Sequence, residues 1–427
     1  MQVLLVDIHP HSDPVTPISL ANLAAVLRRE GHPTELLSIS SGRPASPAGL
    51  RRALSELAPK LVGFTAYQRN LSQVRAVARM ARQASPGCRT LIGGPQAVFL
   101  PDRALAELQE IDIVCHGEGE LVIREAVRAI DEDALDRPIP GATTRQDGDG
   151  WLRGAAPSPP EDLDAYPSPW LDSILDPADW EESILLTSRG CPHHCSFCVT
   201  PAAFGTSIRA HSVERVLDDI SAVASRGSGR LWFADPNFSY DADRVAAILD
   251  GIARRGIKVE MWIETRADML TPDLLRMLHR AGAHTVALGL ESAVPAVLAR
   301  TGKAVDPEAI GTAARTALAA GLDVELFSQY GLPGETVDDA LATLAFVRSC
   351  GVAVRGNSNA QQMQLYFGSS LLRNPEAHGI RPLRGDLPPY LAPGDEFETD
   401  WMCRADMDRV RAAWTAASVD GGKRIVS

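Results

Sequence analysis

The chain has 427 residues and a formal net charge of −12, with 45% hydrophobic, 22% charged and 5% aromatic residues. This composition predicts globular domains, and the length suffices for two of them with connectors. The acidic balance and the scarcity of aromatic rings argue against a nucleic-acid-binding surface. No apolar run reaches membrane-spanning length and no basic leader precedes the first apolar segment. The seven cysteines suit the reducing cytoplasm better than a disulfide framework.

Short apolar segments alternate with helical segments through residues 1–130. One helix ending at Gly31 and another over 71–84 separate strands expected at 3–6, 34–37, 61–65, 90–92 and 111–115. This alternation predicts an α/β fold with a doubly wound, Rossmann-like parallel sheet. Ligands of such sheets lie beyond the carboxyl ends of the strands, where this sequence places glycine-rich turns.

Residues 131–180 differ in composition from the segments on either side. They carry many prolines, acids and Gly-Asp turns, among them Pro138, Pro140 and Pro157. This composition predicts a connector, with a small hairpin around 142–151.

Three cysteines stand at C-x3-C-x2-C spacing in Cys191-Pro-His-His-Cys195-Ser-Phe-Cys198, directly after an expected strand. Thiolates at this spacing can hold three irons of a four-iron, four-sulfur (4Fe-4S) cluster. The fourth iron then stays open for a substrate or cosubstrate, like the open position of catalytic metal sites. Two alternatives are a zinc site completed by an intervening histidine and three unrelated buried thiols.

Strand–helix alternation resumes over residues 181–385, with strands expected at 183–186, 230–234, 259–264, 285–289, 323–327 and 361–366. Thr271 is expected to cap a helix that begins with Pro272. Six such units predict a partial (β/α)6 barrel of the TIM type, whose active site lies at the carboxyl ends of the strands. Residues 386–427 are expected to form a small C-terminal extension.

Polar and turn-forming residues follow the barrel strands at those ends: Asp235, Asn237, Arg266, Glu291, Gly331, Pro333 and Gly334. A zwitterionic cosubstrate needs both signs of charge nearby, and a flat base needs backbone donors beside an apolar wall. A strand-end salt bridge is the alternative interpretation for any one of them. Glu335 has a further alternative, as a cap of the helix that follows.

The cysteine segment, including Phe197 before its last cysteine, resembles the signature of the radical S-adenosylmethionine (SAM) enzymes. The resemblance implies that Cys191, Cys195 and Cys198 are the metal ligands of a 4Fe-4S cluster. It also implies that the open iron chelates SAM and that Phe197 lies near the adenine.

The strand ends also resemble segments of that family. The resemblance implies that the segment around Asp235 and Asn237 faces the methionyl end of SAM. Arg266 and Glu291 would face the carboxylate or ribose, and the loop 331–334 would face the adenine.

Residues 1–130 resemble the cobalamin-binding domain that precedes the cluster domain in one branch of these enzymes. The matching features are the run from Pro17 to Leu27, Gly31-His32 and the glycine-rich turns. The resemblance implies that cobalamin contacts Thr65, Gly93, Gly94, Gly117 and Glu118. The alternative is a flavodoxin-like domain that has lost its ligand.

The segment after the first strand reads Asp7-Ile-His9-Pro-His11-Ser12. Cobalamin proteins that ligate cobalt from below through a histidine carry Asp-x-His-x-x-Gly, and here Ser12 replaces the glycine. Most members of the branch are thought to leave the lower cobalt face without a histidine. We therefore expect His9 to be a loop histidine near the ligand, with cobalt ligation as the alternative.

The resemblance implies a cobalamin-dependent radical SAM enzyme with three cofactors: a 4Fe-4S cluster, SAM and cobalamin. We expect methyl transfer to an unactivated carbon, or to a phosphinate, of a natural-product-type substrate through a 5′-deoxyadenosyl radical and methylcobalamin. The alternatives are a rearrangement, ring contraction or cyclisation without methyl transfer, and a non-enzymatic sensor of cobalamin or redox state. Expected partners are a small-molecule or peptide substrate and an electron donor such as flavodoxin or ferredoxin, with no nucleic acid and no membrane.

Overall fold

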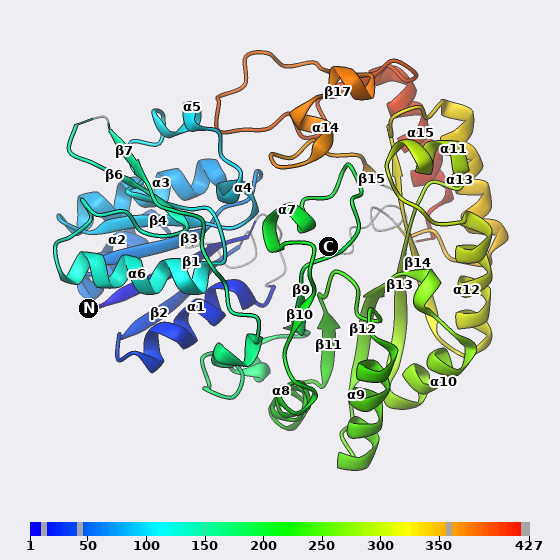
Figure 1. Cartoon of the computed structure of the whole chain (residues 1–427), viewed down its shortest axis with the longest axis horizontal. Coiled ribbons are helices and arrows are strands. Elements are labelled where there is room, and N and C mark those ends of the chain that lie inside the picture. The colour runs from blue at the N-terminus through cyan, green and yellow to red at the C-terminus, as the bar shows by residue number, and fades with distance from the viewer. Residues whose placement is uncertain (10–14, 41–45, 149, 356–360, 420–427) are drawn as a thin grey trace. The chain divides into compact units, whose positions relative to one another are not determined.

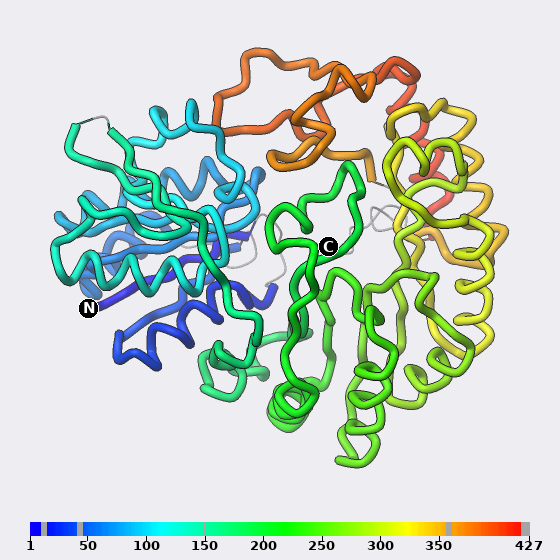
Figure 2. The backbone as a smooth tube through the Cα atoms, in the orientation of Figure 1, coloured from blue at the N-terminus to red at the C-terminus, as the bar shows by residue number. Residues whose placement is uncertain are grey.

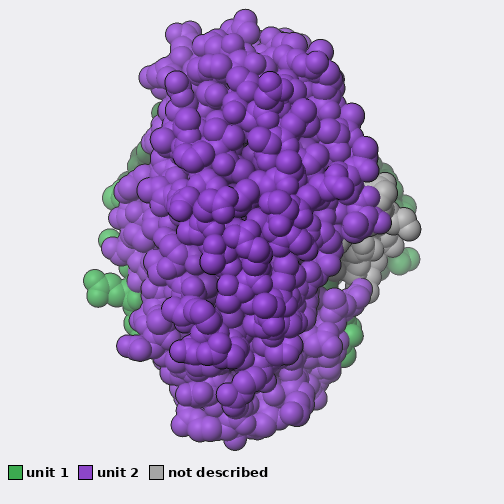
Figure 3. Space-filling view, turned by 90° about the vertical axis from the view of Figure 1, so that its right-hand side faces the viewer, with its two compact units in different colours: residues 1–180, 388–392 green, residues 181–387, 393–427 purple. Residues whose placement is uncertain are grey.

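The computed structural model describes residues 1–427 except 10–14, 41–45, 149, 356–360 and 420–427. Its contacts divide the chain into two compact units, coloured separately in Figure 3. The first unit comprises Met1–Trp180 with Pro388–Ala392, and the second comprises Glu181–Leu387 with Pro393–Ser427. Among the described residues, no helix is long and apolar enough to cross a membrane.

The first unit is built on a seven-stranded sheet with the order β2-β1-β3-β4-β5-β6-β7, and its first five strands are parallel. This confirms the predicted doubly wound sheet. In this strand order the ligand edge lies where the order reverses, between β1 and β3. The strands are β1 (Val3–Ile8), β2 (Thr34–Ile39), β3 (Leu61–Thr65), β4 (Arg89–Gly93), β5 (Ile113–Cys115), β6 (Ala142–Arg145) and β7 (Trp151–Arg153).

Helices cover both faces of this sheet, with α1 packed beside α6 and α2 beside α3 (Figure 1). The local cause is visible at α2, where the Ser46 hydroxyl accepts a hydrogen bond from Gly49 N at 3.0 Å and Pro47 takes the first helical position. The helices are α1 (Ile18–Arg29), α2 (Pro47–Leu57), α3 (Leu71–Ala84), α4 (Pro95–Val98), α5 (Asp102–Leu105) and α6 (Gly119–Asp131), with 3-10 turns η1 (Leu163–Ala165) and η2 (Pro177–Asp179).

The hairpin predicted within residues 131–180 is present as β6 and β7. It also extends the sheet of the first unit, because β6 pairs antiparallel with β5 in the register Val114↔Thr143. This part of the chain therefore belongs to the first unit rather than lying beside it.

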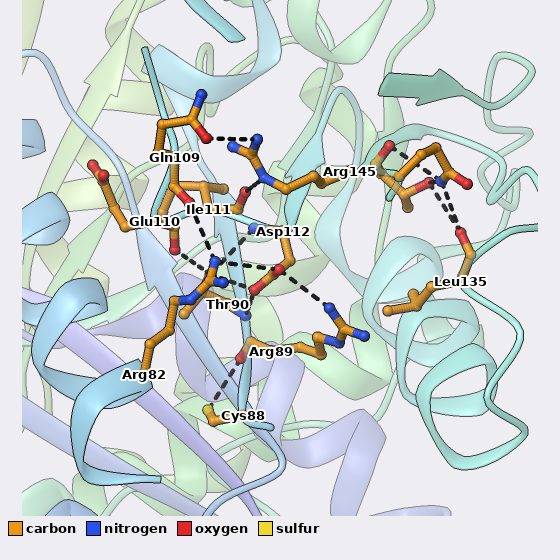
Figure 4. A network of polar contacts seen from close by, with 12 residues as sticks. Arg82, Cys88, Arg89, Thr90, Gln109, Glu110, Ile111, Asp112, Leu135 and Arg145 are labelled. Carbon is orange, nitrogen blue, oxygen red and sulfur yellow. Dashed lines mark hydrogen bonds and ion pairs between the residues drawn. The ribbon is translucent and has the colours of Figure 1, made fainter. Parts of the chain in front are cut away.

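A polar network holds the amino-terminal end of β4 against the segment before β5 (Figure 4). The Asp112 carboxylate accepts hydrogen bonds from Thr90 N at 2.8 Å and Thr90 Oγ1 at 2.9 Å. Arg82 Nη1 and Arg89 Nη1 lie 3.5 and 3.4 Å from the same carboxylate. The buried acid is thus satisfied by hydrogen-bond donors and by cations.

The second unit is built on six strands in sequential order, β8-β11-β12-β13-β14-β15, all parallel. This is the predicted partial barrel. The strands are β8 (Ser183–Leu185), β11 (Arg230–Phe233), β12 (Glu260–Thr265), β13 (Ala283–Glu291), β14 (Asp323–Tyr330) and β15 (Gln361–Gln362).

Helices lie along the outer face of this sheet (Figure 1). They include α8 (Val213–Arg226), α9 (Ala242–Arg255), α10 (Pro272–Ala281), α12 (Pro307–Ala319) and α13 (Val337–Ser349). The predicted cap at α10 is confirmed, since Thr271 Oγ1 accepts a hydrogen bond from Leu274 N at 3.1 Å. At α13, Thr336 and Asp339 form a capping box. Shorter helices and turns are α7 (Thr200–Phe204), α11 (Pro295–Arg300), α14 (Ser370–Arg373), η3 (Ala267–Met269) and η4 (Glu376–His378).

The C-terminal part contains the antiparallel pair β16 (Ile380–Pro382) and β17 (Phe397–Thr399), followed by α15 (Arg404–Ala417). Between the two strands the chain returns to the first unit, along the orange trace of Figure 2. There Gln68 Nε2 donates to Ala392 O at 2.8 Å and Gln96 Nε2 donates to Tyr390 O at 2.7 Å. The first unit is therefore completed by residues from near the end of the chain.

Candidate functional site

The three predicted cluster cysteines lie on the loop between β9 (Ser188–Arg189) and α7. β9 pairs antiparallel with β10 (Arg209–Ala210), so the chain enters and leaves this region side by side. All three cysteines are partly exposed. Their thiols are thus available to a ligand.

Backbone hydrogen bonds anchor the middle of this loop. Ser196 N donates to Thr301 O at 2.8 Å, and Ser196 O accepts from Leu371 N at 3.2 Å. Cys198 N donates to Cys195 O at 3.0 Å, and half-buried Phe197 lies between these two cysteines in the chain. The second and third cysteines therefore flank a segment fixed to the rest of the second unit.

Two cations act on the cysteines. Burial raises the pKa of the Cys191 and Cys195 thiols, and the positive charges of Arg266 and Lys303 act in the opposite direction. Metal coordination removes the thiol proton, and nearby cations stabilise the resulting thiolates.

These residues fit a multi-iron cluster, in which each thiolate binds a different iron. The described residues hold no group of three or more His, Cys, Asp or Glu side chains placed to bind one metal ion. The assignment of Cys191, Cys195 and Cys198 as cluster ligands stays a prediction.

Asp235 follows β11 and is fully buried. Its carboxylate accepts hydrogen bonds from Thr187 N at 2.6 Å, Thr187 Oγ1 at 2.6 Å and Ser188 N at 2.7 Å. Burial raises its pKa, while these hydrogen bonds lower it. Asp235 therefore positions the segment that leads into the cysteine loop, and its contact with SAM stays a prediction.

Asn237 and Arg266 meet at the end of β12. Asn237 Oδ1 accepts hydrogen bonds from Thr265 Oγ1 at 2.9 Å and Arg266 N at 3.3 Å. The Arg266 guanidinium bonds to both carboxylate oxygens of Asp268 at 3.0 and 2.8 Å. Asn237 thus fixes the backbone that presents Arg266 to the cysteine loop.

Glu291 lies at the end of β13 in an unusual backbone conformation. Its φ is +63°, which is strained for a residue other than glycine, and the pairing register shifts beside it. Its carboxylate accepts from Lys303 Nζ at 2.8 Å and from Gln329 Nε2 at 2.6 Å. A Cβ at Gly289 would lie 2.5 Å from Lys303 Nζ, so the glycine makes room for the pair. Such strain is typical of functional sites.

The loop after β14 turns at Gly331 and Gly334, with φ of +82° and +84°, and Pro333 between them is buried. Glu335 Oε2 accepts from Gly331 N at 2.7 Å and Leu332 N at 3.3 Å. Its other oxygen has no partner among the described residues. Burial raises the pKa of Glu335 to about 8. Glu335 therefore braces the turn that was predicted to face adenine.

Predicted cobalamin contacts lie at the carboxyl edge of the first unit's sheet. Thr65 ends β3 and Gly93 ends β4, and the two are register partners. Gly94 has a φ of +90°, and a Cβ there would lie 2.9 Å from Thr65 Cγ2. Glycine therefore lets the backbone turn tightly at this edge, as a large flat ligand requires.

Gly117 and Glu118 follow β5 at the same edge. A Cβ at Gly117 would lie 2.6 Å from Pro157 Cγ, and Glu118 is buried before α6. His9 continues the β1 pairing, because its N donates to Ile39 O at 2.8 Å. The part of its motif that follows, with His11 and Ser12, lies outside the described residues. The cobalamin contacts and the role of His9 stay predictions.

Asn70 is a site residue that the sequence analysis missed. It is fully buried, and its Nδ2 donates to Ile8 O and Thr65 O, both at 2.9 Å, while Oδ1 accepts from Tyr67 N at 2.7 Å. It ties the ends of β1 and β3 together where the strand order reverses. Lys303 and Gln329 were also missed, and no local pattern marks any of the three.

The chain thus combines a doubly wound sheet with a glycine-rich ligand edge and a parallel half-barrel with a cysteine loop, and in each fold ligands bind at the carboxyl ends of the strands. Residues 185–347 match the model of the radical SAM superfamily, and residues 9–127 match that of the B12-binding domain. The chain therefore contains a radical SAM domain and, before it, a B12-binding domain. The predicted radical SAM enzyme class is confirmed, and these domains imply a 4Fe-4S cluster, SAM and cobalamin as cofactors, as predicted.

Named relatives agree with this assignment. An uncharacterized methyltransferase of Pyrococcus horikoshii is 28% identical over 344 residues, which cover 79% of this chain and 74% of that protein. The hopanoid C-3 methylase of Methylococcus capsulatus is 28% identical over 285 residues, which cover 65% of this chain and 53% of that protein. The chain thus spans about three quarters of the first relative and about half of the second.

A solved structure shares the fold. The radical SAM methyltransferase TsrM from Kitasatospora setae superposes with a TM-score of 0.76 at 21% identity, covering 95% of this chain and 82% of that one. That structure is described with tryptophan substrate and a SAM analog bound. The likeness supports the fold of both units.

Proposed function

We propose that the chain is a cobalamin-dependent radical SAM methyltransferase that acts on an unactivated carbon, or on a phosphinate, of a small molecule or peptide. One observation carries the proposal: the cysteine loop with its neighbouring charged residues and a B12-binding domain occur in the same chain. Radical cleavage of SAM needs only the cysteine loop and its charged neighbours. A B12-binding domain adds a methyl carrier. The methyltransferase and methylase names of the relatives support this choice.

In this proposal the charged strand ends bind SAM. The Glu291–Lys303 pair and Arg266 present both signs of charge, as the zwitterionic methionyl group requires. Phe197 and the loop 331–334 enclose the adenine. Asp235 and Asn237 act mainly by holding the backbone in place.

Cobalamin would occupy the carboxyl edge of the first unit, over Thr65, Gly93, Gly94, Gly117 and Glu118. When bound, the cluster supplies an electron to SAM and cobalamin carries a methyl group. The chain orients both cofactors and excludes water from the radical.

The reaction consumes two SAM molecules for each methyl group transferred. One SAM takes an electron and breaks into methionine and a 5′-deoxyadenosyl radical, which removes a hydrogen atom from the substrate and becomes 5′-deoxyadenosine. The other gives up its methyl group and becomes S-adenosylhomocysteine. The methyl group joins the substrate radical, and an external electron donor such as flavodoxin or ferredoxin supplies the two electrons consumed. We place this chemistry in the cytoplasm, because the cysteines are all unpaired and the cluster needs a reducing compartment.

The test uses full-length protein with cluster and cobalamin reconstituted anaerobically, SAM labelled in its methyl group, and a chemical reductant. Mass spectrometry counts 5′-deoxyadenosine and S-adenosylhomocysteine. We expect both products, with the label on cobalamin in the absence of substrate, and loss of S-adenosylhomocysteine when cobalamin is omitted. If 5′-deoxyadenosine forms without S-adenosylhomocysteine in the presence of cobalamin, methyl transfer is wrong and a rearrangement takes its place.

Two cysteine variants control this experiment. Cys198→Ala removes a proposed cluster ligand, so 5′-deoxyadenosine formation should fall to background. Cys350→Ala alters a buried cysteine elsewhere in the second unit and should preserve both products. Equal loss in the two variants would show that folding, and not the cluster, had been disturbed.

A further inference from the structure

The inner face of the half-barrel is accessible, unlike its outer face. Along β11 and β12 the side chains facing the helices, such as Phe233 and Ile263, are fully buried. The alternate side chains on the inner face are partly exposed, among them Trp232, Trp262 and Glu264. Solvent therefore reaches these inner side chains, in contrast to the packed interior of a closed TIM barrel.

Aromatic rings form one part of this inner surface. Trp232 and Trp262 are register partners on β11 and β12, and their rings meet edge to face at 5.6 Å. The ring centroid of Phe327 on β14 lies 6.0 Å from that of Trp262. Partly exposed aromatic rings of this kind offer negatively polarised faces to a bound group.

Two carboxylates complete the surface. Glu264 on β12 and Glu325 on β14 both stand beside Ala287 of β13 in the strand register, so they share one level and one face of the sheet. Trp262 Nε1 lies 3.5 Å from Glu325 Oε1. The small, buried side chain of Ala287 lies between the two acids.

The two acids differ in whether a positively charged side chain lies near them. Arg355 Nη1 lies 3.9 Å from Glu325 Oε1. Glu264 has no ion pair within the part of the chain that the structure describes. Burial, reinforced by the charges of Asp235 and Glu325, raises its pKa to about 7. An acid that is only partly exposed and lies beside other acids is costly when ionised unless a cation joins it.

We propose that this surface, formed by Trp232, Trp262, Glu264, Glu325 and Phe327, binds a cationic group of the substrate, a protonated amine. An ammonium group would neutralise Glu264 and lie against the ring faces, so one ligand satisfies both features. An anionic substrate would face two carboxylates and no free cation among these residues. The identification of the bound amine as the substrate rests on the proposed function. The binding of an amine at this surface does not depend on that function.

The surface lies near the proposed SAM site along the same strands. Gly289 and Phe327 are register partners one level closer to the carboxyl edge, and Gly289 is two residues from Glu291. An amine held between Glu264 and Glu325 would thus place the rest of its molecule toward the SAM-binding end of the half-barrel.

The test measures binding by isothermal titration calorimetry to full-length protein carrying its cluster and cobalamin. The probes are 2-phenylethylamine and 3-phenylpropionate, which share size and ring but carry opposite charges. We expect binding of the amine and none of the acid. Equal binding of both, or binding of the acid alone, would overturn the proposal. This outcome is independent of methyl transfer, because no SAM is present.

A pair of variants on β12 localises the binding. Glu264→Gln keeps the shape and removes the charge, so the amine should bind at least about tenfold more weakly. Glu260→Gln changes an exposed acid four residues earlier on the same strand and should bind the amine as the natural chain does. Equal affinity in Glu264→Gln and the natural chain would place the amine elsewhere and overturn the proposal.

Discussion

Buried carboxylates occur in both units, but the charges around them differ: Asp112 and Glu110 of the first unit lie among cations, whereas Glu335 of the second unit has no ion pair among the described residues. Asp112 and Glu110 are 3% and 5% exposed, and each lies near two arginines, as Figure 4 shows for Asp112. Glu110 pairs with Arg75 and, at 3.5 Å, with Arg79. In the second unit Glu335 is fully buried with one oxygen unpartnered among the described residues.

This difference distinguishes buried acids that maintain the packing of the fold from buried acids that lie where a ligand acts. A buried acid with its cations in place is part of one particular packing, and removal of either partner is strongly destabilising because it leaves an uncompensated buried charge. A buried acid without a cation has a raised pKa, and such groups concentrate where a ligand acts. Asp112 lies at the amino end of its sheet, far along the strands from the ligand edge, whereas Glu335 braces a loop at the carboxyl end.

The largest effect is expected from Asp112→Ala in the first unit. The change leaves Thr90 N without its acceptor in a buried place and removes the carboxylate that pairs with Arg82 and Arg89. Breaking a buried network of this kind costs about 3–5 kcal/mol of unfolding free energy. Urea unfolding followed by circular dichroism would measure it.

Asp102→Ala is the matched control for that variant. Asp102 pairs with Arg153 in the same unit, but its side chain is 80% exposed. An exposed pair contributes about 0–1 kcal/mol. Similar losses in both variants would remove the distinction between compensated buried acids and surface pairs.

Much of this comparison could not be predicted from the sequence. The strands and the cysteine loop could, because apolar runs and ligand spacing are local patterns: β3 and α3 have the expected bounds. The partners of buried charges are distant in sequence, since Lys303 and Gln329 follow Glu291 by 12 and 38 residues. Asp235 shows the same limit, because its position after a strand was predictable and its bonds to Thr187 and Ser188 were not.

An intermediate effect is expected from Lys303→Met. This change keeps the length of the side chain and removes the cation from Glu291, while Gln329 still donates to the carboxylate. The proposed SAM site then loses a positive charge, and SAM should bind roughly thirtyfold more weakly, about 2 kcal/mol. Calorimetric titration of the cluster-loaded protein with SAM measures the change.

Lys258→Met tests whether overall charge explains that result. Lys258 is exposed at the opposite end of β12, so its removal should leave SAM affinity unchanged. Unchanged affinity in Lys303→Met would mean that the Glu291–Lys303 pair is structural, like the arginine network of the first unit.

The smallest effect is a change in the pH dependence of stability at Glu335. Burial raises its pKa from 4.5 to about 8 in the folded chain, so between these values the folded state keeps a proton that the unfolded state has lost. The contribution of this group to the unfolding free energy therefore falls as pH rises through this window, by about 1 kcal/mol per pH unit.

Glu335→Gln stays neutral and can still accept from Gly331 N and Leu332 N, so it should gain stability relative to the natural chain between pH 6 and pH 7. Urea unfolding at both pH values measures the difference, with exposed Glu308→Gln as the control. A constant difference in unfolding free energy between Glu335→Gln and the natural chain at the two pH values would show that Glu335 ionises normally. Glu335 would then resemble the buried acids of the first unit, whose charges are balanced by their surroundings.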